Sequence, residues 1–415
     1  MKKNEIIAPK VEKREYFCIV KRLKTISDII IIGIFALIFN AVTPVSAQTD
    51  STLTDSIEVS LLTCSPHDEV YSLYGHTAIR YRNLKTGEDW AFNYGIFSFK
   101  KPFFVLRFAL GKTDYELGVV PFEIFKREYR KFGSQVVEQV LNISDSEKQS
   151  IYDALDENYK PQNRVYRYNF FYDNCTTRAR DIIERCIDGK IEYPSDNSDE
   201  APTYREIIHE HTKNHPWAAV GNDLCLGFKA DARTNAREQQ FIPSRLMYDF
   251  DRAQIYNNGE YKPLVKARNI VVAPGVQITE KGFPLSPTAC AIILFAASVF
   301  IALLEYRKHH IYIMWDAALM LTLGVAGIIT TTLLFSEHPT TSTNLQVLLL
   351  NPIHLLFIPK VLRKRSTIYW NYLTFTIILF FIGSFFQDYA EGMTIVALSL
   401  LTRCWIHIKS QSLKR

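Results

Sequence analysis

Five long apolar runs in the last third of the chain constrain its fold more than any other feature. They follow Pro284 and occupy residues 285–304, 312–335, 345–362, 367–386 and 392–408. An α-helix rises about 1.5 Å per residue, so roughly 20 apolar residues cross the hydrocarbon core of a bilayer. We therefore predict a membrane-embedded domain at 284–415, an all-α bundle of five transmembrane helices.

Lys and Arg are distributed unevenly among the loops of this domain. Arg307, Lys308, the cluster at 360–365 and the C-terminal tail fall on one side of the predicted bundle. The opposite loops, 336–344 and 387–392, contain neither residue. Because Lys and Arg in short loops mark the cytoplasmic side, the region before Pro284 is predicted to lie outside the cytoplasm.

The N-terminus independently indicates the same orientation. Eight basic residues within 1–25 precede an apolar run at 29–39 and a Val-Ser-Ala sequence that ends at Ala47. This order predicts a secretory signal at 1–47, or an uncut anchor with the same orientation. Residues 48–283 then form a domain in the outer compartment.

Residues 48–283 have the pattern of an α+β domain. Segments rich in β-forming residues predict strands at 53–64, 76–83, 89–94, 115–120 and 265–273. Ser144 stands three residues before Glu147, an arrangement that caps a helix N-terminus. Helices are predicted at 144–158, 176–187, 203–211 and 241–255.

The overall composition excludes two broad classes of protein. The chain has 48 Lys and Arg against 43 Asp and Glu, a net charge of only +5. This balance argues against a nucleic-acid partner, because such binders gather their basic residues into a patch or stripe. Hydrophobic residues make up 47% of the chain, enough to bury a core, which excludes intrinsic disorder.

The best candidate for a nucleophile is Cys175, at the mouth of the predicted helix 176–187. It lies in the sequence Tyr-Asp-Asn-Cys-Thr-Thr-Arg at 172–178, with Arg178 and Arg180 in the first turns. A helix N-terminus carries partial positive charge and unpaired N–H groups, which stabilise a thiolate and can receive an oxyanion. An arbitrary cysteine is more often a small buried hydrophobe, but this polar and basic context favours a nucleophile.

A thiolate also needs a proton donor and acceptor within reach, and histidine suits that task near neutral pH. His76 begins a predicted strand directly after Gly75 and is the expected partner if this strand lies against the helix. Taken alone, His76 would more often be structural. A third group usually orients the imidazole, and we favour Asn93, flanked by aromatic residues, over Glu88 and Asp89.

The other cysteines and histidines of the outer domain have simpler interpretations. One disulfide can form among Cys64, Cys186 and Cys225 in this compartment, although Cys64 is assigned a structural role. The three histidines within 209–215 lack the further ligands of a metal site, so a solvated helix face is favoured. We therefore expect no metal site.

Several short motifs occur in an order that resembles a known family. They are Leu-Thr-Cys-Ser-Pro (62–66), Tyr-Gly-His-Thr-Ala-Ile-Arg (74–80), Phe-Asn-Tyr-Gly-Ile-Phe (92–97), Phe-Ala-Leu-Gly (108–111), Tyr-Asp-Asn-Cys-Thr-Thr (172–177), Phe-Ile-Pro (241–243), Ser-Glu-His-Pro (336–339) and Asn-Leu-Gln ahead of Asn-Pro (344–352). Together they resemble the Lnb lipoprotein N-acyltransferases over nearly the whole chain. The order of histidine before cysteine also resembles circularly permuted papain-like thiol enzymes, including the lecithin:retinol acyltransferase and NlpC groups.

The resemblance implies an activity, its partners and a location. An acyl chain would pass from a membrane phospholipid to the N-terminal amine of a lipoprotein's diacylglyceryl-cysteine, through a thioester on Cys175 and without metal or cofactor. The catalytic domain would lie in the periplasm and the helices in the bacterial inner membrane. Catalysis is assigned to Cys175, His76 and Asn93, and substrate contacts are assigned to Tyr74, Arg80, Asn174, Arg178, His338 and Asn344.

Two points remain open from the sequence. The aromatic segment 97–104 fits either the membrane interface or the protein core. The same Cys–His pair would also serve a membrane-anchored cell-wall peptidase or amidase, although five helices are an excessive anchor for one. A membrane-tethered binding module with both residues in its core would need no catalysis.

Overall fold

The computed structural model describes residues 56–97, 102–194, 201–277, 282–363 and 367–412. The predicted signal segment at 1–47 lies outside these residues. Within them, an α+β domain is followed by a domain made of helices, as the sequence pattern indicates.

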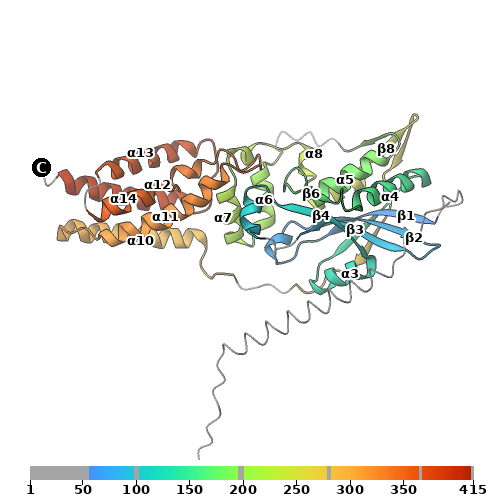
Figure 1. Cartoon of the computed structure of the whole chain (residues 1–415), viewed down its shortest axis with the longest axis horizontal. Helices are drawn as coiled ribbons and strands as arrows, with labels where there is room; N and C mark the ends of the chain where they lie inside the picture. Colours follow the sequence, from blue (N-terminus) through green and yellow to red (C-terminus); the bar gives the residue numbers. More distant parts are fainter. Residues whose placement is uncertain (1–55, 98–101, 195–200, 278–281, 364–366, 413–415) are drawn as a thin grey trace, which may run out of the picture. The chain divides into compact units, whose positions relative to one another are not determined.

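A seven-stranded sheet forms the centre of the α+β domain (Figure 1). Its order is β10-β5-β1-β2-β3-β4-β6, and each neighbouring pair is antiparallel. These strands are β1 (Ile57–Cys64), β2 (His76–Asn83), β3 (Asp89–Ile96), β4 (Asp114–Pro121), β5 (Val136–Leu141), β6 (Val165–Arg167) and β10 (Val265–Val272). A smaller sheet joins β7 (Lys190–Glu192), β8 (Gln254–Asn257) and β9 (Glu260–Pro263).

Helices cover both faces of the large sheet. Figure 1 shows α3 (Phe122–Lys131) on one side, and α4 (Asp145–Tyr159) and α5 (Cys175–Cys186) on the other. The side chains of β2 alternate between two cores, because successive residues of a strand point to opposite faces. Ala78 lies in the core with Phe122 of α3, whereas Ile79 lies in the core with Ile182 of α5.

Five further short helices complete the α+β domain. They are α2 (Phe104–Ala109), α6 (Tyr204–Thr212), α7 (Pro216–Cys225), α8 (Ala236–Gln239) and α9 (Pro243–Arg252), together with the 3-10 turns η1 (Val70–Ser72) and η2 (Phe228–Asp231). Helix α9 packs beside α5 on the same face of the sheet. Helices α6 and α7 pack against each other.

Most of the predicted elements are present, with small shifts at their ends. The Ser144 cap is confirmed: its hydroxyl accepts the Glu147 N–H, and the Glu147 carboxylate accepts the Ser144 N–H. The helix predicted at 241–255 is present as α9, but its predicted end is wrong, because α9 ends at Arg252 and β8 then pairs with β7 and β9. Helix α3 and strand β5 were not predicted.

The C-terminal domain consists of helices at all five apolar runs. They are α10 (Pro287–Lys308), α11 (Ile313–Leu333), η3 (Leu345–Leu348) with α12 (Ile353–Leu362), α13 (Thr367–Gly383) and α14 (Met393–Ser412). Among the described residues, 287–308, 313–333 and 345–362 are long and apolar enough to span a membrane, and 368–383 is a shorter apolar helix. The domain is therefore a helical transmembrane domain, and five crossings remain a prediction.

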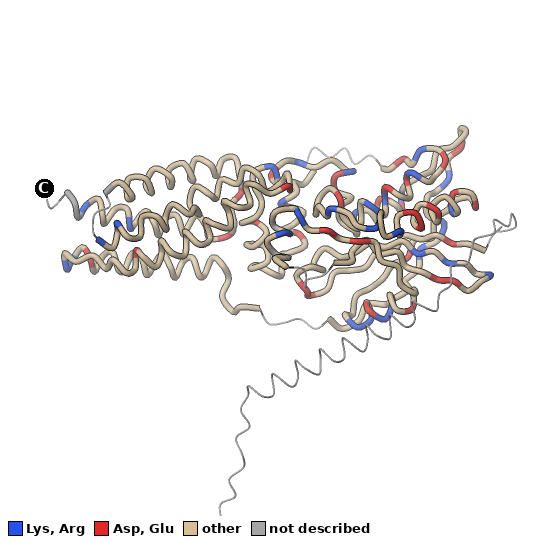
Figure 2. Tube along the Cα trace, in the orientation of Figure 1, with Lys and Arg blue, Asp and Glu red and all other residues tan. Residues whose placement is uncertain are grey.

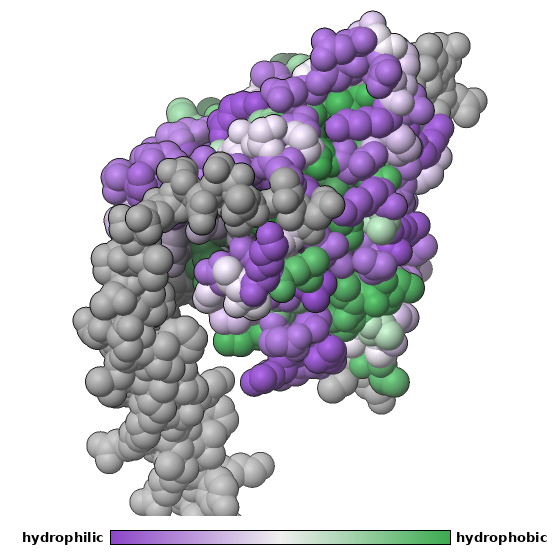
Figure 3. All heavy atoms as spheres, turned by 90° about the vertical axis from the view of Figure 1, so that its right-hand side faces the viewer, coloured by the Kyte–Doolittle hydropathy of each residue, from purple (hydrophilic) through white to green (hydrophobic). Residues whose placement is uncertain are grey.

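The two domains differ in their surfaces. Large apolar side chains such as Phe300, Leu321 and Phe375 are exposed along the helices, and Figure 2 shows Lys and Arg at the end of these helices nearest the C-terminus. On the face of the sheet domain that Figure 3 shows, hydrophilic residues predominate. This contrast is typical of a domain in lipid joined to a domain in water.

A buried charge cluster links three of the membrane helices. Arg403 of α14 donates to both carboxylate oxygens of Glu305 on α10, at 2.6 and 2.9 Å, and to Asp316 on α11 at 2.7 Å. His407 of α14 lies 2.7 Å from the second oxygen of Asp316. Charges inside a membrane protein are costly unless paired, so this cluster fixes the relative positions of the three helices.

We predict that Arg403→Met destabilises the full-length protein by about 3–5 kcal/mol, because it leaves two buried carboxylates without their cation. Thermal unfolding of the detergent-solubilised protein measures the change. Lys308→Met is the matched control, because Lys308 is exposed at the end of α10 and its loss costs about 0.5 kcal/mol or less. Equal melting temperatures for the two variants would contradict a stabilising role for the cluster.

Candidate active site

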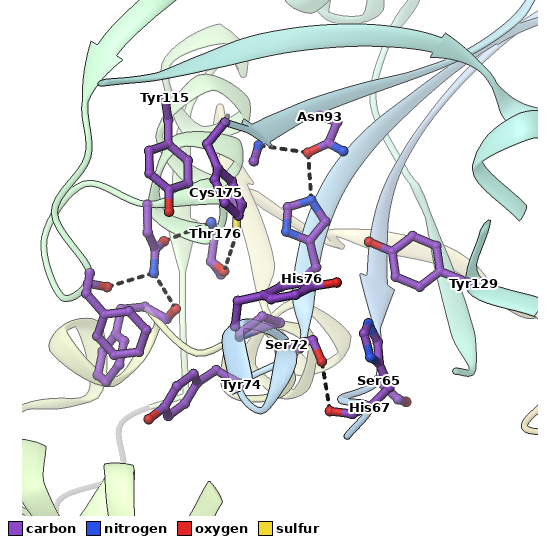
Figure 4. Close-up of a pocket in the computed structure, with 18 of the residues that line it drawn as sticks. Ser65, His67, Ser72, Tyr74, His76, Asn93, Tyr115, Tyr129, Cys175 and Thr176 are labelled. Atoms are coloured by element: carbon purple, nitrogen blue, oxygen red, sulfur yellow. Dashed lines mark hydrogen bonds between the residues drawn. The ribbon is translucent and has the colours of Figure 1, made fainter. Parts of the chain in front are cut away.

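A cavity of about 210 Å³ lies where β2 and α5 begin (Figure 4). Its polar lining includes His76, Asn93, Asn174, Cys175 and Thr176, together with Ser65, His67, Ser72 and Glu128. The rest of the wall is largely aromatic and includes Tyr71, Tyr74, Phe97, Tyr115, Tyr129, Phe132, Tyr168, Phe170 and Phe241. The structure thus combines a small set of polar groups with an apolar lining, as binding cavities commonly do.

The start of α5 places Cys175. Asn174 is the N-cap residue, and its side-chain oxygen accepts the N–H groups of Thr176 and Thr177 at 2.9 and 3.0 Å. The side-chain NH₂ of Asn174 donates to the carbonyls of Phe170 and Phe241, both at 2.9 Å. These four bonds hold the cap in one orientation, and Cys175 is the first residue of α5, one residue before the predicted helix at 176–187.

The neighbouring strands place His76 and Asn93 on one face of the sheet. The Asn93 oxygen accepts the backbone N–H of Gly95 at 2.7 Å and lies 2.7 Å from Nε2 of His76. Because this oxygen can only accept, Nε2 must carry a hydrogen. In the neutral imidazole Nδ1 is then the unprotonated nitrogen, which leaves it as the acceptor for the hydrogen bond with Cys175.

The electrostatics of the site favour a thiolate beside an imidazolium. Burial raises the pKa of the Cys175 thiol, but the charge and hydrogen bond of His76 and the Thr77 N–H outweigh burial and lower the pKa from 9.0 to about 7. Burial lowers the pKa of His76, but the thiolate and the hydrogen bonds to Cys175 and Asn93 raise it above 6.5. A nucleophilic sulfur is therefore populated near neutral pH.

Tyrosines with neutral hydroxyls line the cavity around this pair, and Glu128 adds one carboxyl group to the lining. Burial raises the pKa of Tyr115, Tyr129 and Tyr168, so their hydroxyls stay protonated. Figure 4 shows Tyr115 and Tyr129 flanking Cys175 and His76. Apolar rings close to the sulfur suit a substrate with a long hydrocarbon chain.

Gly95 is required by the close approach of the histidine ring. A Cβ atom at this position would lie 2.6 Å from Cε1 of His76 and 3.1 Å from the Asn93 oxygen. Real atoms do not approach that closely, so any side chain would displace the imidazole. Gly95 thus positions His76 without touching the sulfur.

The predicted substrate contacts divide into two groups. Tyr74 and Asn174 line the cavity, and Asn174 is also the helix cap. Arg80 and Arg178 do not line it. Arg80 is buried in ion pairs with Asp89 and Glu138, and Arg178 pairs with Asp173 through two bonds of 2.6 and 2.8 Å, so local carboxylates occupy both cations.

His338 and Asn344, also predicted to contact substrate, instead join the two domains. Nε2 of His338 lies 3.1 Å from the carbonyl of Phe108. The side-chain NH₂ of Asn344 donates to the Leu224 carbonyl at 2.9 Å, in the last turn of α7. Helix ends leave carbonyls without partners, so Asn344 caps α7 rather than lining the cavity.

The remaining cysteines and histidines form neither a disulfide nor a metal site among the described residues. Cys64, Cys186 and Cys225 are free thiols. The solvated face predicted for the histidines within 209–215 is only partly present: His209 is exposed and lies 2.9 Å from Asp223, whereas His211 is half-buried and packs against Tyr74.

Several residues that shape the site were not predicted from sequence. The Thr77 N–H donates to the sulfur of Cys175, and Gly95 leaves room for the imidazole of His76. Tyr115 and Tyr168 line the cavity. The glycine after Asn93-Tyr94 was a usable signal, because a glycine inside a strand pattern indicates a close approach. The tyrosines gave no signal: Tyr115 is on β4, far from Cys175 in sequence, and nothing about Tyr168, although it precedes Cys175 by only seven residues, shows that its ring faces the cavity.

The fold and the site together define a membrane protein whose globular α+β domain carries a Cys–His pair. Two family models match this chain: the Lnb N-terminal periplasmic domain over residues 45–210 and the Lnb transmembrane domain over residues 278–414. The chain therefore belongs to the Lnb family, with a periplasmic N-terminal domain and a transmembrane C-terminal domain, and this membership indicates an enzyme. No curated protein and no solved structure matches the chain.

We predict that iodoacetamide alkylates Cys175 with a midpoint near pH 7, because its folded-state pKa is lowered to about 7. His76→Ala should raise the midpoint, because the imidazolium is lost and burial of the thiol remains. Peptide mass spectrometry of the alkylated protein follows Cys175 separately from the other thiols. A midpoint unchanged by His76→Ala would contradict the ion pair.

We further predict that Gly95→Ala slows acylation of Cys175 by a short activated ester about 100-fold, since a displacement of about 1 Å has effects of that size. Mass spectrometry of the acylated protein measures this rate. Gly221→Ala on α7 is the control, because no atom lies within 4 Å of its added Cβ. Equal rates for both variants would show that the imidazole position is not critical.

Proposed function

We propose that this protein is a lipoprotein N-acyltransferase, which moves an acyl chain from a membrane phospholipid to the N-terminal amine of a diacylated lipoprotein. The observation that carries the proposal is the Cys175–His76–Asn93 arrangement at an apolar cavity, in a periplasmic domain joined to a transmembrane domain. Both substrates are lipids, which accounts for the membrane domain. The location we propose is the bacterial inner membrane.

The first half of the proposed reaction forms a thioester. The Cys175 thiolate attacks the ester carbonyl of the phospholipid, and the carbonyl oxygen becomes an oxyanion. Asn174 already binds the N–H groups of Thr176 and Thr177, so the oxyanion would face the N–H of Cys175 at the positive end of α5. The C–O bond then breaks, and the His76 imidazolium protonates the departing lysophospholipid oxygen.

The second half transfers the chain to the lipoprotein. Neutral His76 accepts a proton from the attacking N-terminal amine, which forms an amide bond as the C–S bond breaks. The thiolate of Cys175 and the imidazolium of His76 are then restored. Asn93 keeps Nε2 protonated throughout, so that Nδ1 serves both steps. The reaction written this way consumes no metal or diffusible cofactor.

The domain arrangement that we propose places the catalytic domain between an N-terminal signal and a transmembrane bundle. Residues 1–47 are a signal or anchor, 48–283 a catalytic domain of permuted papain-like fold, and 284–415 a bundle of five crossings. In support of the permuted fold, the histidine strand precedes the cysteine helix in the chain, and Thr77 of β2 contacts Thr176 of α5 at 3.1 Å.

Deletion of the gene tests the proposal in cells that have no redundant enzyme. We expect their lipoproteins to keep a free N-terminal amine, and mass spectra of the lipopeptides to lose one amide-linked acyl chain. Cys175→Ala should not restore the chain, because it removes the nucleophile, whereas the matched thiol variant Cys186→Ala should restore it. Triacylated lipopeptides in the deletion strain would rule out this function.

A thioester-linked acyl group on Cys175, formed with phospholipid vesicles and removed by a lipopeptide amine, would distinguish acyl transfer from peptide cleavage. A cell-wall peptidase or amidase with the same pair would form no such adduct. A non-catalytic binding module would tolerate Cys175→Ala in cells.

A further inference from the structure

Helix α2 is held at the outer end of a membrane-spanning helix. The loop that follows α11 donates the Glu337 N–H to the Leu110 carbonyl at 3.0 Å, and His338 lies 3.1 Å from the Phe108 carbonyl. Gly111 fits here because its φ is +70° and an added Cβ would lie 3.1 Å from Glu337. Since the candidate membrane span 313–333 ends at Leu333, α2 is held four residues beyond the end of that span.

The side chains around this contact are apolar and exposed. Phe103 is 78% exposed, Leu106 49% and Phe108 37%, and Phe335 beyond α11 is 78% exposed. Such a group is unfavourable in water, yet it continues the apolar surface of α11. The occupant that fits this continuity is the lipid surface itself.

Basic residues stand beside this apolar group. The side chains of Arg107 and Arg167 are 43% and 51% exposed, although both share Asp114, and Lys112 is exposed next to them. Long cationic side chains beside exposed aromatic rings are typical of segments at the surface of a phospholipid bilayer.

A row of aromatic rings connects α2 with the nucleophile. The ring centroids of Phe108 and Tyr168 lie 6.1 Å apart, those of Tyr168 and Tyr115 4.1 Å, and those of Tyr115 and Phe97 4.8 Å. Tyr168, Tyr115 and Phe97 line the cavity that contains Cys175. An acyl chain that left the bilayer at α2 would therefore meet apolar surface along its path to the sulfur.

We propose that Phe103, Leu106, Phe108 and Phe335 form a lipid portal, which rests in the outer surface of the bilayer and admits a phospholipid acyl chain along Phe108, Tyr168 and Tyr115 to Cys175. The identity of the substrate that the portal admits, a phospholipid, depends on the proposed function. Its position at the bilayer follows from the contacts of α2 with the loop after α11 and can be tested without catalysis.

Photo-crosslinking in vesicles tests the position of the portal. A benzophenone amino acid replaces Leu106 in full-length Cys175→Ala protein, reconstituted in phosphatidylethanolamine and phosphatidylglycerol. The control carries it at Ile270 of β10, which is 62% exposed. We expect at least tenfold more lipid adduct at 106 than at 270, by intact mass. Equal adducts at both positions would overturn the portal.

A competition between two esters tests the use of the portal. For Phe103→Ser with Leu106→Ser, we expect the ratio of acylation by vesicle phospholipid to acylation by water-soluble p-nitrophenyl butyrate to fall about tenfold. Ile270→Ser should leave the ratio within twofold. An unchanged ratio in a folded double variant would overturn the portal. Wild-type protein that phospholipid does not acylate would instead overturn the proposed function, and the cross-linking result would then decide the portal alone.

Discussion

The hydrogen bonds of the Asn174 side chain determine where α5 begins, and the geometry of the site depends on that point. One side of the amide accepts the first N–H groups of the helix, and the other donates to carbonyls of two remote segments, at Phe170 and Phe241. A shift of one residue in the helix start would turn the sulfur by about 100° around the helix axis, away from His76. The Asn174 cap therefore determines both where α5 begins and where the sulfur of Cys175 lies relative to His76.

The apolar cavity wall and the charged pair have opposing effects on the thiol. Burial among tyrosines raises the pKa of Cys175, whereas His76 and the Thr77 N–H lower it, and the second effect is the larger. The balance requires the imidazole to stay in place, which Asn93 and the absence of a side chain at Gly95 ensure. A site that accepts a hydrocarbon chain and still stabilises a thiolate needs both the apolar wall and the nearby imidazolium.

Loops of the membrane domain form hydrogen bonds with the catalytic domain and so help to position part of its cavity. Side-chain amides of Asn344, Gln346 and Gln387 donate to carbonyls at the end of α7, and Asn222 of α7 donates to the Tyr74 hydroxyl at 2.7 Å. Tyr74 lines the cavity two residues before His76. The loops at the outer ends of the membrane helices thus support one wall of the cavity through a short chain of hydrogen bonds.

Local patterns in the sequence predicted much of this molecule. Apolar runs of sufficient length predicted the membrane helices, and the pattern at 176–187 predicted a helix with Cys175 at its start. The roles of Arg80 and Asn344 could not be predicted in this way. A sequence shows that a side chain can bind a polar group, but not whether a substrate or another part of the protein supplies that group. Asp89 and Glu138 flank Arg80 only after three strands have paired.

Local sequence patterns indicated the transmembrane domain, many of the helices and strands around the site, and the side chains with the chemistry of a nucleophile and a base. Those properties depend on local composition and periodicity. The three-dimensional structure was needed to show that His76, Asn93 and Cys175 meet, that Gly95 leaves room for the ring, and that α2 contacts the loop after α11. These are contacts between distant residues, and they arise from packing of the sheet, the helices and the membrane domain against one another.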